Sequence, residues 1–178
     1  DEVLSTTQDY PRMLTTSEQR RRRDGIAVNK VDFKVPVQSS EELVKLYRDN
    51  IGPRTKVIHV SQVVFMTGQI SPVAAICKLA RERGIISIVD GAHAFAHVPF
   101  KFSDVAPGYY GASLHKWLSA PVGTGLLYVR KDRIGKTWAL MPAAQTQDND
   151  IRKFEEIGTH PAAMHNGILQ ALEFHKNI

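Results

Sequence analysis

Lys116 follows two chemically active residues in the stretch YYGASLHKWLSAPVGTG, positions 109–125. Ser113 and His115 come just before it, and two glycines come soon after. A lysine in such company is suited to holding a carbonyl compound covalently next to a phosphate. A serine or histidine considered alone is more often a local cap or a packed core residue. The spacing therefore indicates a candidate covalent site, which needs further groups to support it.

Asp90 supplies a second group, because it ends the apolar run IISIVD at positions 85–90. A carboxylate at the end of a buried strand is costly unless it meets a cation or several hydrogen-bond donors. It either caps the following turn, GAHA, or keeps a proton on the ring nitrogen of a cofactor such as pyridoxal 5'-phosphate. One bound molecule of that cofactor would satisfy Asp90, Ser113, His115 and Lys116 together.

The composition is that of one globular domain, with 178 residues, 43% hydrophobic and 23% charged. A chain of this size buries a core without disulfides or metal ions, and we predict no metal site. Cys77 cannot form an internal bridge, which favours a reducing compartment, and helical spacing predicts that it is buried. We find neither a membrane-spanning run nor a signal peptide, and we expect a cytoplasmic protein with no membrane partner.

The net charge of +5 includes an arginine run at positions 20–23. Such a run could contact nucleic acid, but no aromatic residues are interleaved with it. It is better explained as the end of a helix, where cations oppose the helix dipole before Gly25 stops the helix. We therefore predict no nucleic-acid partner.

Strand-like and helix-like segments alternate along the chain, which predicts a three-layer α/β/α sandwich with a mainly parallel sheet. The run at 85–90 is typical of a strand buried on both faces, and Ser39 or Ser40 should cap the second helix. Ligands of such sheets bind beyond the carboxyl ends of the strands, where Gln8, Asp90 and residues 113–116 fall. We expect strands at 1–7, 26–35, 56–61, 85–90, 109–115 and 123–132, and helices at 10–23, 41–51, 73–84 and 158–175.

Four motifs in order carry a resemblance to a known family: IVDGAHAFAH, SLHKWL, GTGLLYVRKD and EEIGTHPAA. Together they resemble the class V aminotransferase family of fold-type I pyridoxal-phosphate enzymes, and within it the isopenicillin N epimerase-like and cysteine desulfurase-like branch. The resemblance implies that residues 1–178 form most of the cofactor-binding large domain. The N-terminal segment and the C-terminal small domain of the family are then expected to lie outside this chain.

The resemblance also implies a role for each matching residue. Lys116 corresponds to the lysine that forms the internal aldimine and later moves the α-proton of the substrate, and Asp90 to the partner of the ring nitrogen. Ala92 corresponds to the small residue against one face of the ring, and His93 to a residue near the phenolic oxygen. The phosphate ligands would be Ser113 and His115.

Three further matches are less direct. Thr159 corresponds to a threonine that reaches the phosphate of the neighbouring subunit in a homodimer; alternatively it caps the helix that begins near Pro161. Gln62 stands where related enzymes place an amide near the substrate or the phenolic oxygen, or else it is a solvated turn residue. Gln8 occupies the position of a ring-stacking histidine, and this departure argues against a cysteine desulfurase.

These matches imply an enzyme that acts on an amino acid by epimerisation or carbon–sulfur cleavage. Alternatives are a cysteine desulfurase or selenocysteine lyase, an aminotransferase, and a non-catalytic fragment that serves as a binding module. A nucleotide-binding protein that uses GTG for phosphate is disfavoured, because those glycines precede the strand-like LLYV rather than a helix.

Overall fold

The computed structural model describes residues 1–177, and within them six strands form one sheet in the order β2-β1-β3-β4-β5-β6. The pairings among β1 to β5 are parallel, and β6 runs antiparallel to β5. The mainly parallel sheet predicted from the alternation of segments is confirmed. The strands are β1 (Glu2–Thr6), β2 (Ala27–Val31), β3 (Thr55–Ser61), β4 (Ile86–Asp90), β5 (Tyr109–Ser113) and β6 (Gly125–Val129).

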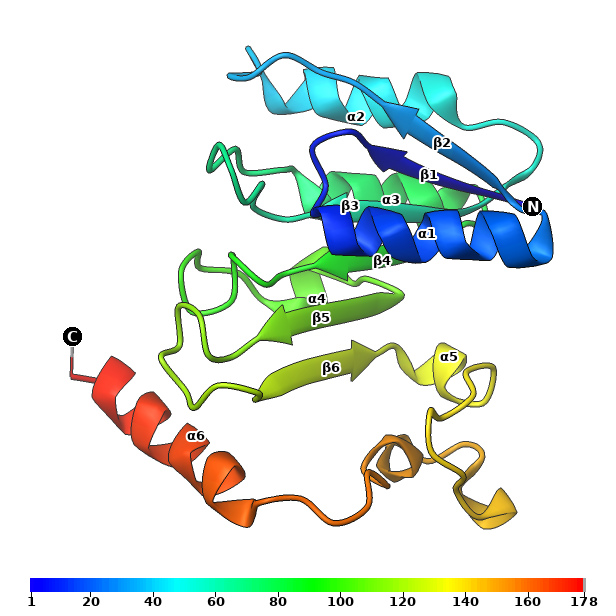
Figure 1. Cartoon of the computed structure of the whole chain (residues 1–178). Helices are drawn as coiled ribbons and strands as arrows, with labels where there is room; N and C mark the ends of the chain where they lie inside the picture. The colour runs from blue at the N-terminus through cyan, green and yellow to red at the C-terminus, as the bar shows by residue number, and fades with distance from the viewer. Residues whose placement is uncertain (178) are drawn as a thin grey trace.

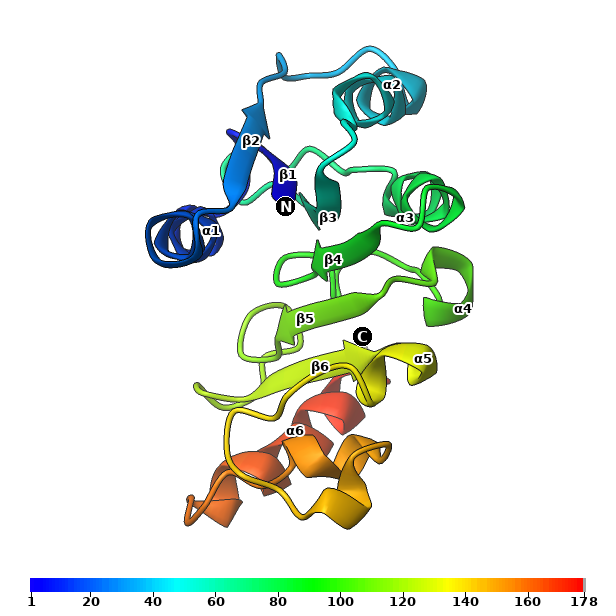
Figure 2. The ribbon, with the colours of Figure 1, turned by 90° about the vertical axis from the view of Figure 1, so that its right-hand side faces the viewer.

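Helices cover both faces of this sheet, so the three-layer sandwich is confirmed as well. Helix α1 lies on one face beside β2, whereas α2, α3 and α4 lie on the other (Figure 2). The helices are α1 (Pro11–Asp24), α2 (Ser40–Asn50), α3 (Val73–Glu82), α4 (Phe102–Val105), α5 (Lys131–Ile134) and α6 (Ala162–His175). Two 3-10 turns, η1 (Gln145–Gln147) and η2 (Ile151–Phe154), lie between α5 and α6.

The ends of the helices follow from local chemistry. Ser39, rather than Ser40, is the cap of α2, and its hydroxyl accepts a hydrogen bond of 3.3 Å from the amide of Glu42. Helix α1 ends at Gly25, whose φ of 70° is a left-handed conformation that glycine adopts without steric cost.

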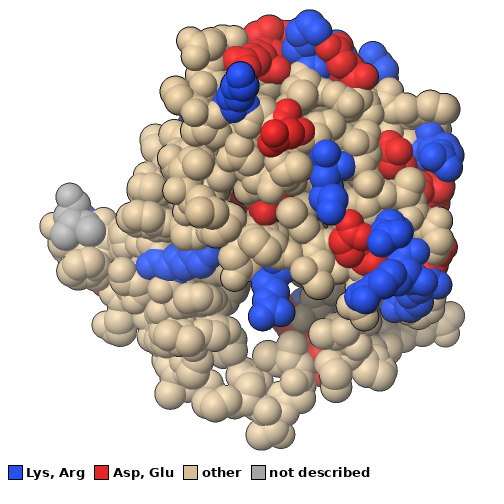
Figure 3. Space-filling model, turned by 45° about the horizontal axis from the view of Figure 1, so that its top comes forward, with Lys and Arg blue, Asp and Glu red and all other residues tan. Residues whose placement is uncertain are grey.

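The arginine run at positions 20–23 lies at this end of α1, as predicted. Arg21 pairs with Glu18 at 2.7 Å and Arg23 with Asp24 at 2.9 Å, so the run is accompanied by carboxylates. Figure 3 shows cationic and anionic side chains mingled on the face that it draws. This part of the chain is thus a solvated helix end in which charges of both signs are interspersed.

The main core lies between the sheet and helices α2 and α3. Leu4, Ile58, Val89, Tyr110 and Ile76 are among its fully buried side chains. Cys77 is fully buried too, as predicted, and burial raises the pKa of its thiol, which keeps the thiol inert. Within residues 1–177, no helix is both long enough and apolar enough to cross a membrane.

Strand β4 departs from its expected burial on both faces. Ser87 and Val89 are buried against the α2–α3 side, but Ile86 and Ile88 on the opposite side are only half-buried. The physical reason is that α1 lies beside β2 (Figure 2), so it does not cover the centre of its face. The prediction of a doubly buried strand was therefore wrong, and an apolar sheet surface borders the site described below.

Candidate functional site

A cavity of about 600 Å³ opens beside the carboxyl ends of β4 and β5. Asp90, Ala92, Ser113 and Lys116 all line it, together with Tyr10 at the start of α1. The parallel pairing of β4 with β5, in which Asp90 lies opposite Gly111, brings these residues to one edge of the sheet (Figure 1). The structure thus gathers four of the predicted site residues around one space.

Asp90 is held by the turn that follows it. Its Oδ1 accepts a hydrogen bond of 2.9 Å from the amide of Ala92, so the predicted capping interaction is present. Gly91 has to be glycine, because a Cβ added there would lie 1.9 Å from the hydroxyl oxygen of Tyr110. The chain can therefore turn sharply after β4 and leave the half-buried carboxyl group of Asp90 at the cavity wall.

Lys116 is positioned by a short turn after β5. Leu114 and Leu118 are buried in a second small cluster and hold the two sides of the turn. The amide of Lys116 donates to the carbonyl oxygen of Ser113 at 3.3 Å, which closes the turn. Lys116 is only partly buried, and its side chain lines the cavity.

The amine of Lys116 lies 3.0 Å from Nε2 of His93, and 5.7 Å from the ring centre of Tyr10. The other ring nitrogen of His93, Nδ1, accepts a hydrogen bond of 3.3 Å from the indole N–H of Trp117. Burial lowers the pKa of His93, because desolvation disfavours the charged imidazolium. The imidazole is therefore neutral at pH 7.

Gln62 borders the site from the end of β3. Its side-chain oxygen accepts a hydrogen bond of 2.8 Å from the Tyr110 hydroxyl, and its backbone N–H donates to the backbone oxygen of Asp90 at 2.8 Å. The side chain is buried, so the interpretation of Gln62 as a solvated turn residue was wrong. Burial, and secondly the charge of Asp90, raise the pKa of Tyr110, which stays a neutral hydrogen-bond donor.

Five of the predicted site residues lie outside the cavity lining. His93 and Gln62 contact the lining residues Lys116 and Tyr110, and the other three are His115, Gln8 and Thr159. His115 is exposed, and its Nδ1 faces the carbonyl oxygen of Thr124 at 3.3 Å. The side-chain amide of Gln8 donates to the carbonyl oxygen of Phe33 at 2.7 Å. Thr159 is exposed in the segment before α6. That helix is capped at Pro161 without any side-chain bond, so the interpretation of Thr159 as its cap was wrong.

Sequence reasoning missed three residues near this edge of the sheet. Tyr10 lies against Lys116, Trp117 contacts His93, and Asp9 is a buried carboxylate after β1. Asp9 and Tyr10 follow a strand end, which is a usable signal in a parallel sheet. The orientation of Trp117 had no such signal, because it depends on how two separate turns pack together.

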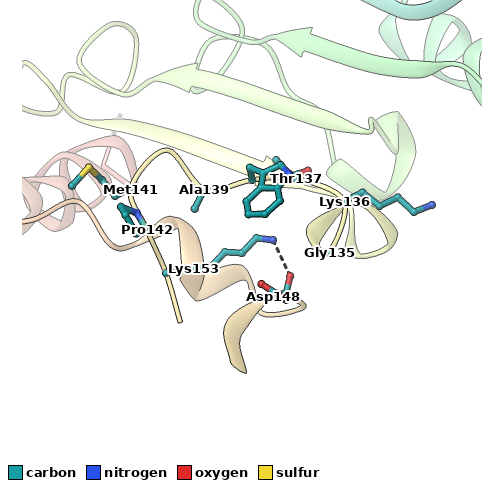
Figure 4. Close-up of a pocket in the computed structure, with 10 residues that line it drawn as sticks. Gly135, Lys136, Thr137, Ala139, Met141, Pro142, Asp148 and Lys153 are labelled. Atoms are coloured by element: carbon teal, nitrogen blue, oxygen red, sulfur yellow. Dashed lines mark hydrogen bonds between the residues drawn. The ribbon is translucent and has the colours of Figure 1, made fainter. Parts of the chain in front are cut away.

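A separate cavity of about 360 Å³ lies among α5, the segment after it and η2 (Figure 4). Lys153 is buried there and donates to the backbone oxygens of Ile134 and Asp148 at 2.6 and 2.8 Å. These bonds tie together the segments on the two sides of the cavity. Within residues 1–177, no cluster of three histidine, cysteine or acidic side chains could hold a metal ion.

The arrangement after β4 and β5 combines an amine, a carboxylate and a hydroxyl around one space, and comparison with known proteins gives it a context. The sequence model of the family described as Aminotransferase class-V matches residues 1–178. The chain belongs to this family.

A curated relative, the isopenicillin N epimerase of Amycolatopsis lactamdurans, is 33% identical over 162 residues, which is 86% of this chain and 40% of the relative. A probable cysteine desulfurase of Xylella fastidiosa is 33% identical over 82 residues, covering 46% of this chain and 20% of that protein. The chain therefore spans less than half the length of these relatives.

Among solved structures, the cystine C–S lyase C-DES in complex with its product, cysteine persulfide, superposes with a TM-score of 0.85 and 25% identity. The match covers 99% of this chain and 50% of C-DES. A variant of C-DES in which a lysine is replaced by alanine carries glycine covalently linked to its PLP cofactor, and it superposes with a TM-score of 0.86. The fold of this chain is thus that of C-DES over the half of C-DES that it matches.

Proposed function

We propose that this chain binds pyridoxal 5'-phosphate and forms most of the cofactor-binding large domain of an enzyme that acts on an amino acid. The observation that carries the proposal is the position of the Lys116 amine, which faces a neutral imidazole at 3.0 Å in a cavity that also holds the Asp90 carboxylate. Lys116 would hold the aldehyde carbon of the cofactor, because a lysine amine condenses with carbonyl compounds to form a Schiff base.

The residues present fit the group. Asp90 has a single short backbone hydrogen bond to Oδ1 and keeps capacity for a cationic ring nitrogen. Ala92 and Gly111 keep that wall free of bulk, since a Cβ added at Gly111 would meet no atom within 4 Å. Ser113, which also lines the cavity, offers a hydroxyl for phosphate, and we assign His115 as the second phosphate ligand.

Bound pyridoxal phosphate would supply an aldehyde for the substrate amine and a ring that withdraws electrons from the α-carbon. Asp90 would hold a proton at the ring nitrogen, which keeps the ring electron-poor. The amine of Lys116, once released by the substrate, would take the α-proton and return it. His93 would face the phenolic oxygen, with Gln62 behind it, and Gln8 would lie near the ring.

An epimerase-like or C–S lyase-like outcome is favoured by the relatives. Isopenicillin N epimerase matches over most of this chain, and C-DES, a cystine C–S lyase, matches its fold over 99% of the residues. Cysteine desulfurase, selenocysteine lyase and aminotransferase chemistry are the alternatives, and a non-catalytic binding module is the alternative outside the enzymes. We further propose a homodimer in which Thr159 reaches the phosphate site of the other chain.

Reduction with borohydride in the presence of pyridoxal phosphate, followed by peptide mapping, tests the central assignment. The label is expected on Lys116, and Lys116→Ala is expected to lose the visible absorption of the bound cofactor together with the label. Lys136→Ala, which removes an exposed lysine outside the site, is the matched control and should leave both unchanged. A label on another lysine would overturn the proposal.

A second measurement separates enzyme from binding module. The loaded protein is incubated with a panel of amino acids, and loss of the α-proton is followed by exchange with deuterated water. Exchange that requires both Lys116 and the cofactor supports an enzyme. Cofactor binding without exchange on any amino acid supports the binding module instead.

A further inference from the structure

Trp117 makes a contact that determines the protonation of its neighbour. Its indole N–H donates to Nδ1 of His93 at 3.3 Å. An indole nitrogen is a donor and cannot accept, so Nδ1 has to be the unprotonated nitrogen of the imidazole. In a neutral imidazole the single proton then resides on Nε2.

That proton faces Lys116. The distance between Nε2 of His93 and the amine nitrogen of Lys116 is 3.0 Å, which is a hydrogen-bond distance. A protonated Nε2 has to donate, so the amine has to accept through its lone pair, and an ammonium group has no lone pair. Both hydrogen bonds therefore exist together only when Lys116 is unprotonated.

Trp117 is held in the required orientation although its side chain is 44% exposed. Its ring stacks on His97, with ring centres 3.7 Å apart and the planes 6° from parallel. His97 is itself anchored, since its Nδ1 lies 2.9 Å from the carbonyl oxygen of His93 and donates to it. The same turn after β4 thus carries both the imidazole that faces Lys116 and the ring that supports the indole.

We propose that Trp117 is a positioning residue that fixes the proton of His93 on Nε2 and thereby favours the unprotonated, nucleophilic form of Lys116. Fast capture of the cofactor aldehyde, the expected consequence, rests on the proposed function. The position of the proton on His93 does not, because it can be measured without any cofactor.

Long-range ¹H–¹⁵N correlation spectra of the full chain, labelled with ¹⁵N-histidine and free of cofactor, test the proton position directly. In the wild type we expect His93 to carry its proton on Nε2. Trp117→Phe keeps a ring on His97 but removes the donor, and we expect the proton to distribute over both nitrogens. Trp138→Phe changes the other tryptophan, which is 95% exposed, and should leave the His93 signals as they are.

The rate of pyridoxal phosphate capture, followed by absorbance, gives the second readout. We expect Trp117→Phe to slow capture about tenfold near pH 7, which is the effect of losing one hydrogen bond that favours the free amine. The deficit should vanish at alkaline pH, where the amine is unprotonated in either protein. The other titratable groups that face Lys116 and His93 are Asp90, Tyr10 and His97, and the substitution leaves all three in place.

A His93 proton on Nδ1 in the wild type would overturn the inference, even if the variant could not be produced. The same tautomer in wild type and Trp117→Phe, or a deficit in capture that persists at alkaline pH, would do so too. Borohydride labelling separates this failure from failure of the proposed function. A label on Lys116 with an unresponsive tautomer removes only the role of Trp117, whereas a label on another lysine removes the function.

Discussion

Two aspartates follow neighbouring parts of the same sheet edge, and they lie in opposite environments. Asp9, after β1, is 2% exposed and accepts four hydrogen bonds. The amide and hydroxyl of Thr6 donate to its Oδ2 at 2.7 and 3.0 Å, and the amide and hydroxyl of Ser61 donate to its Oδ1 at 2.8 and 2.7 Å. Asp9 thus ties the end of β1 to the end of β3.

Asp90, at the end of β4, is half-buried and accepts one hydrogen bond, from the amide of Ala92, while it lines the cavity. The carboxyl group and the kind of strand end are the same in both cases. What differs is how many donors the surrounding chain supplies. A carboxylate whose acceptors are occupied is part of the fold, whereas one with spare acceptors can hold a ligand.

Lys153 and Lys116 show the same contrast between a side chain held by the fold and one that is available to a ligand. Lys153 is 5% exposed and its amine donates to two backbone carbonyl oxygens, which bind it into the segments around α5 and η2. Lys116 instead contacts the imidazole of His93 at 3.0 Å, at the wall of a cavity. Two carbonyl oxygens hold the amine of Lys153 within the fold, whereas the amine of Lys116 lies where a ligand in the cavity can reach it.

Asp90→Asn is the substitution with the largest expected effect. An amide cannot hold a proton at a ring nitrogen as a carboxylate does, so turnover should fall by about a thousandfold, equivalent to ~4 kcal/mol. The free energy of unfolding should change by less than about 1 kcal/mol, because an amide oxygen can still accept from Ala92. Turnover and urea denaturation are measured side by side, with the exposed Asp49→Asn as control. Near-normal turnover would contradict the role of Asp90.

Asp9→Ala should show the reverse pattern. The change leaves the donors of Thr6 and Ser61 without their acceptor in a buried place, so the free energy of unfolding should fall by about 3 kcal/mol. Asp90→Ala should cost less than about 1 kcal/mol in the same urea denaturation experiment. Equal losses for the two variants would contradict the distinction between Asp9, which stabilises the fold, and Asp90, which is available to a ligand.

Tyr110→Phe tests the contact between the end of β3, which Asp9 holds, and the cavity that Asp90 lines. Tyr110 is fully buried, packs against Phe100 and Phe102, and donates its hydroxyl to Gln62. Because phenylalanine keeps the packing, the loss is that of one buried hydrogen bond, about 1 kcal/mol in thermal or urea unfolding. A loss as large as that of Asp9→Ala would mean that the region around Asp90 depends on a buried hydrogen-bond network as much as the region around Asp9 does.

Thr159→Val, with an expected effect no larger than that of Tyr110→Phe, tests whether a second chain completes the site around Asp90. Thr159 is exposed and lies outside the cavity lining of its own chain. We expect the affinity for pyridoxal phosphate to weaken by a few-fold, about 1 kcal/mol, at protein concentrations where two chains pair. Titration above and below the pairing concentration checks this, and an affinity that the substitution leaves unchanged at both would exclude the cross-subunit contact.

Much of the site edge could be predicted because parallel strands share a direction. Once the segments ending at Ser61, Asp90 and Ser113 are recognised as parallel strands, their carboxyl ends have to meet at one edge. The same logic placed Lys116, which follows β5 by a short turn. It failed for burial, since whether β4 is covered on both faces depends on how far α1 extends across the sheet.

The sequence by itself determined the order along the chain of the six strands and of helices α1, α2, α3 and α6, the three-layer fold and the residue types at the strand ends, because these depend on local propensity and periodicity. The short helices α4 and α5 were not predicted. The tertiary structure alone decided that Asp9 is enclosed while Asp90 stays available, that Gln62 is buried and that Trp117 donates to His93. Those outcomes depend on which donors and rings from distant turns come within hydrogen-bond distance. Local sequence does not determine how the side chains of separate turns are oriented toward one another.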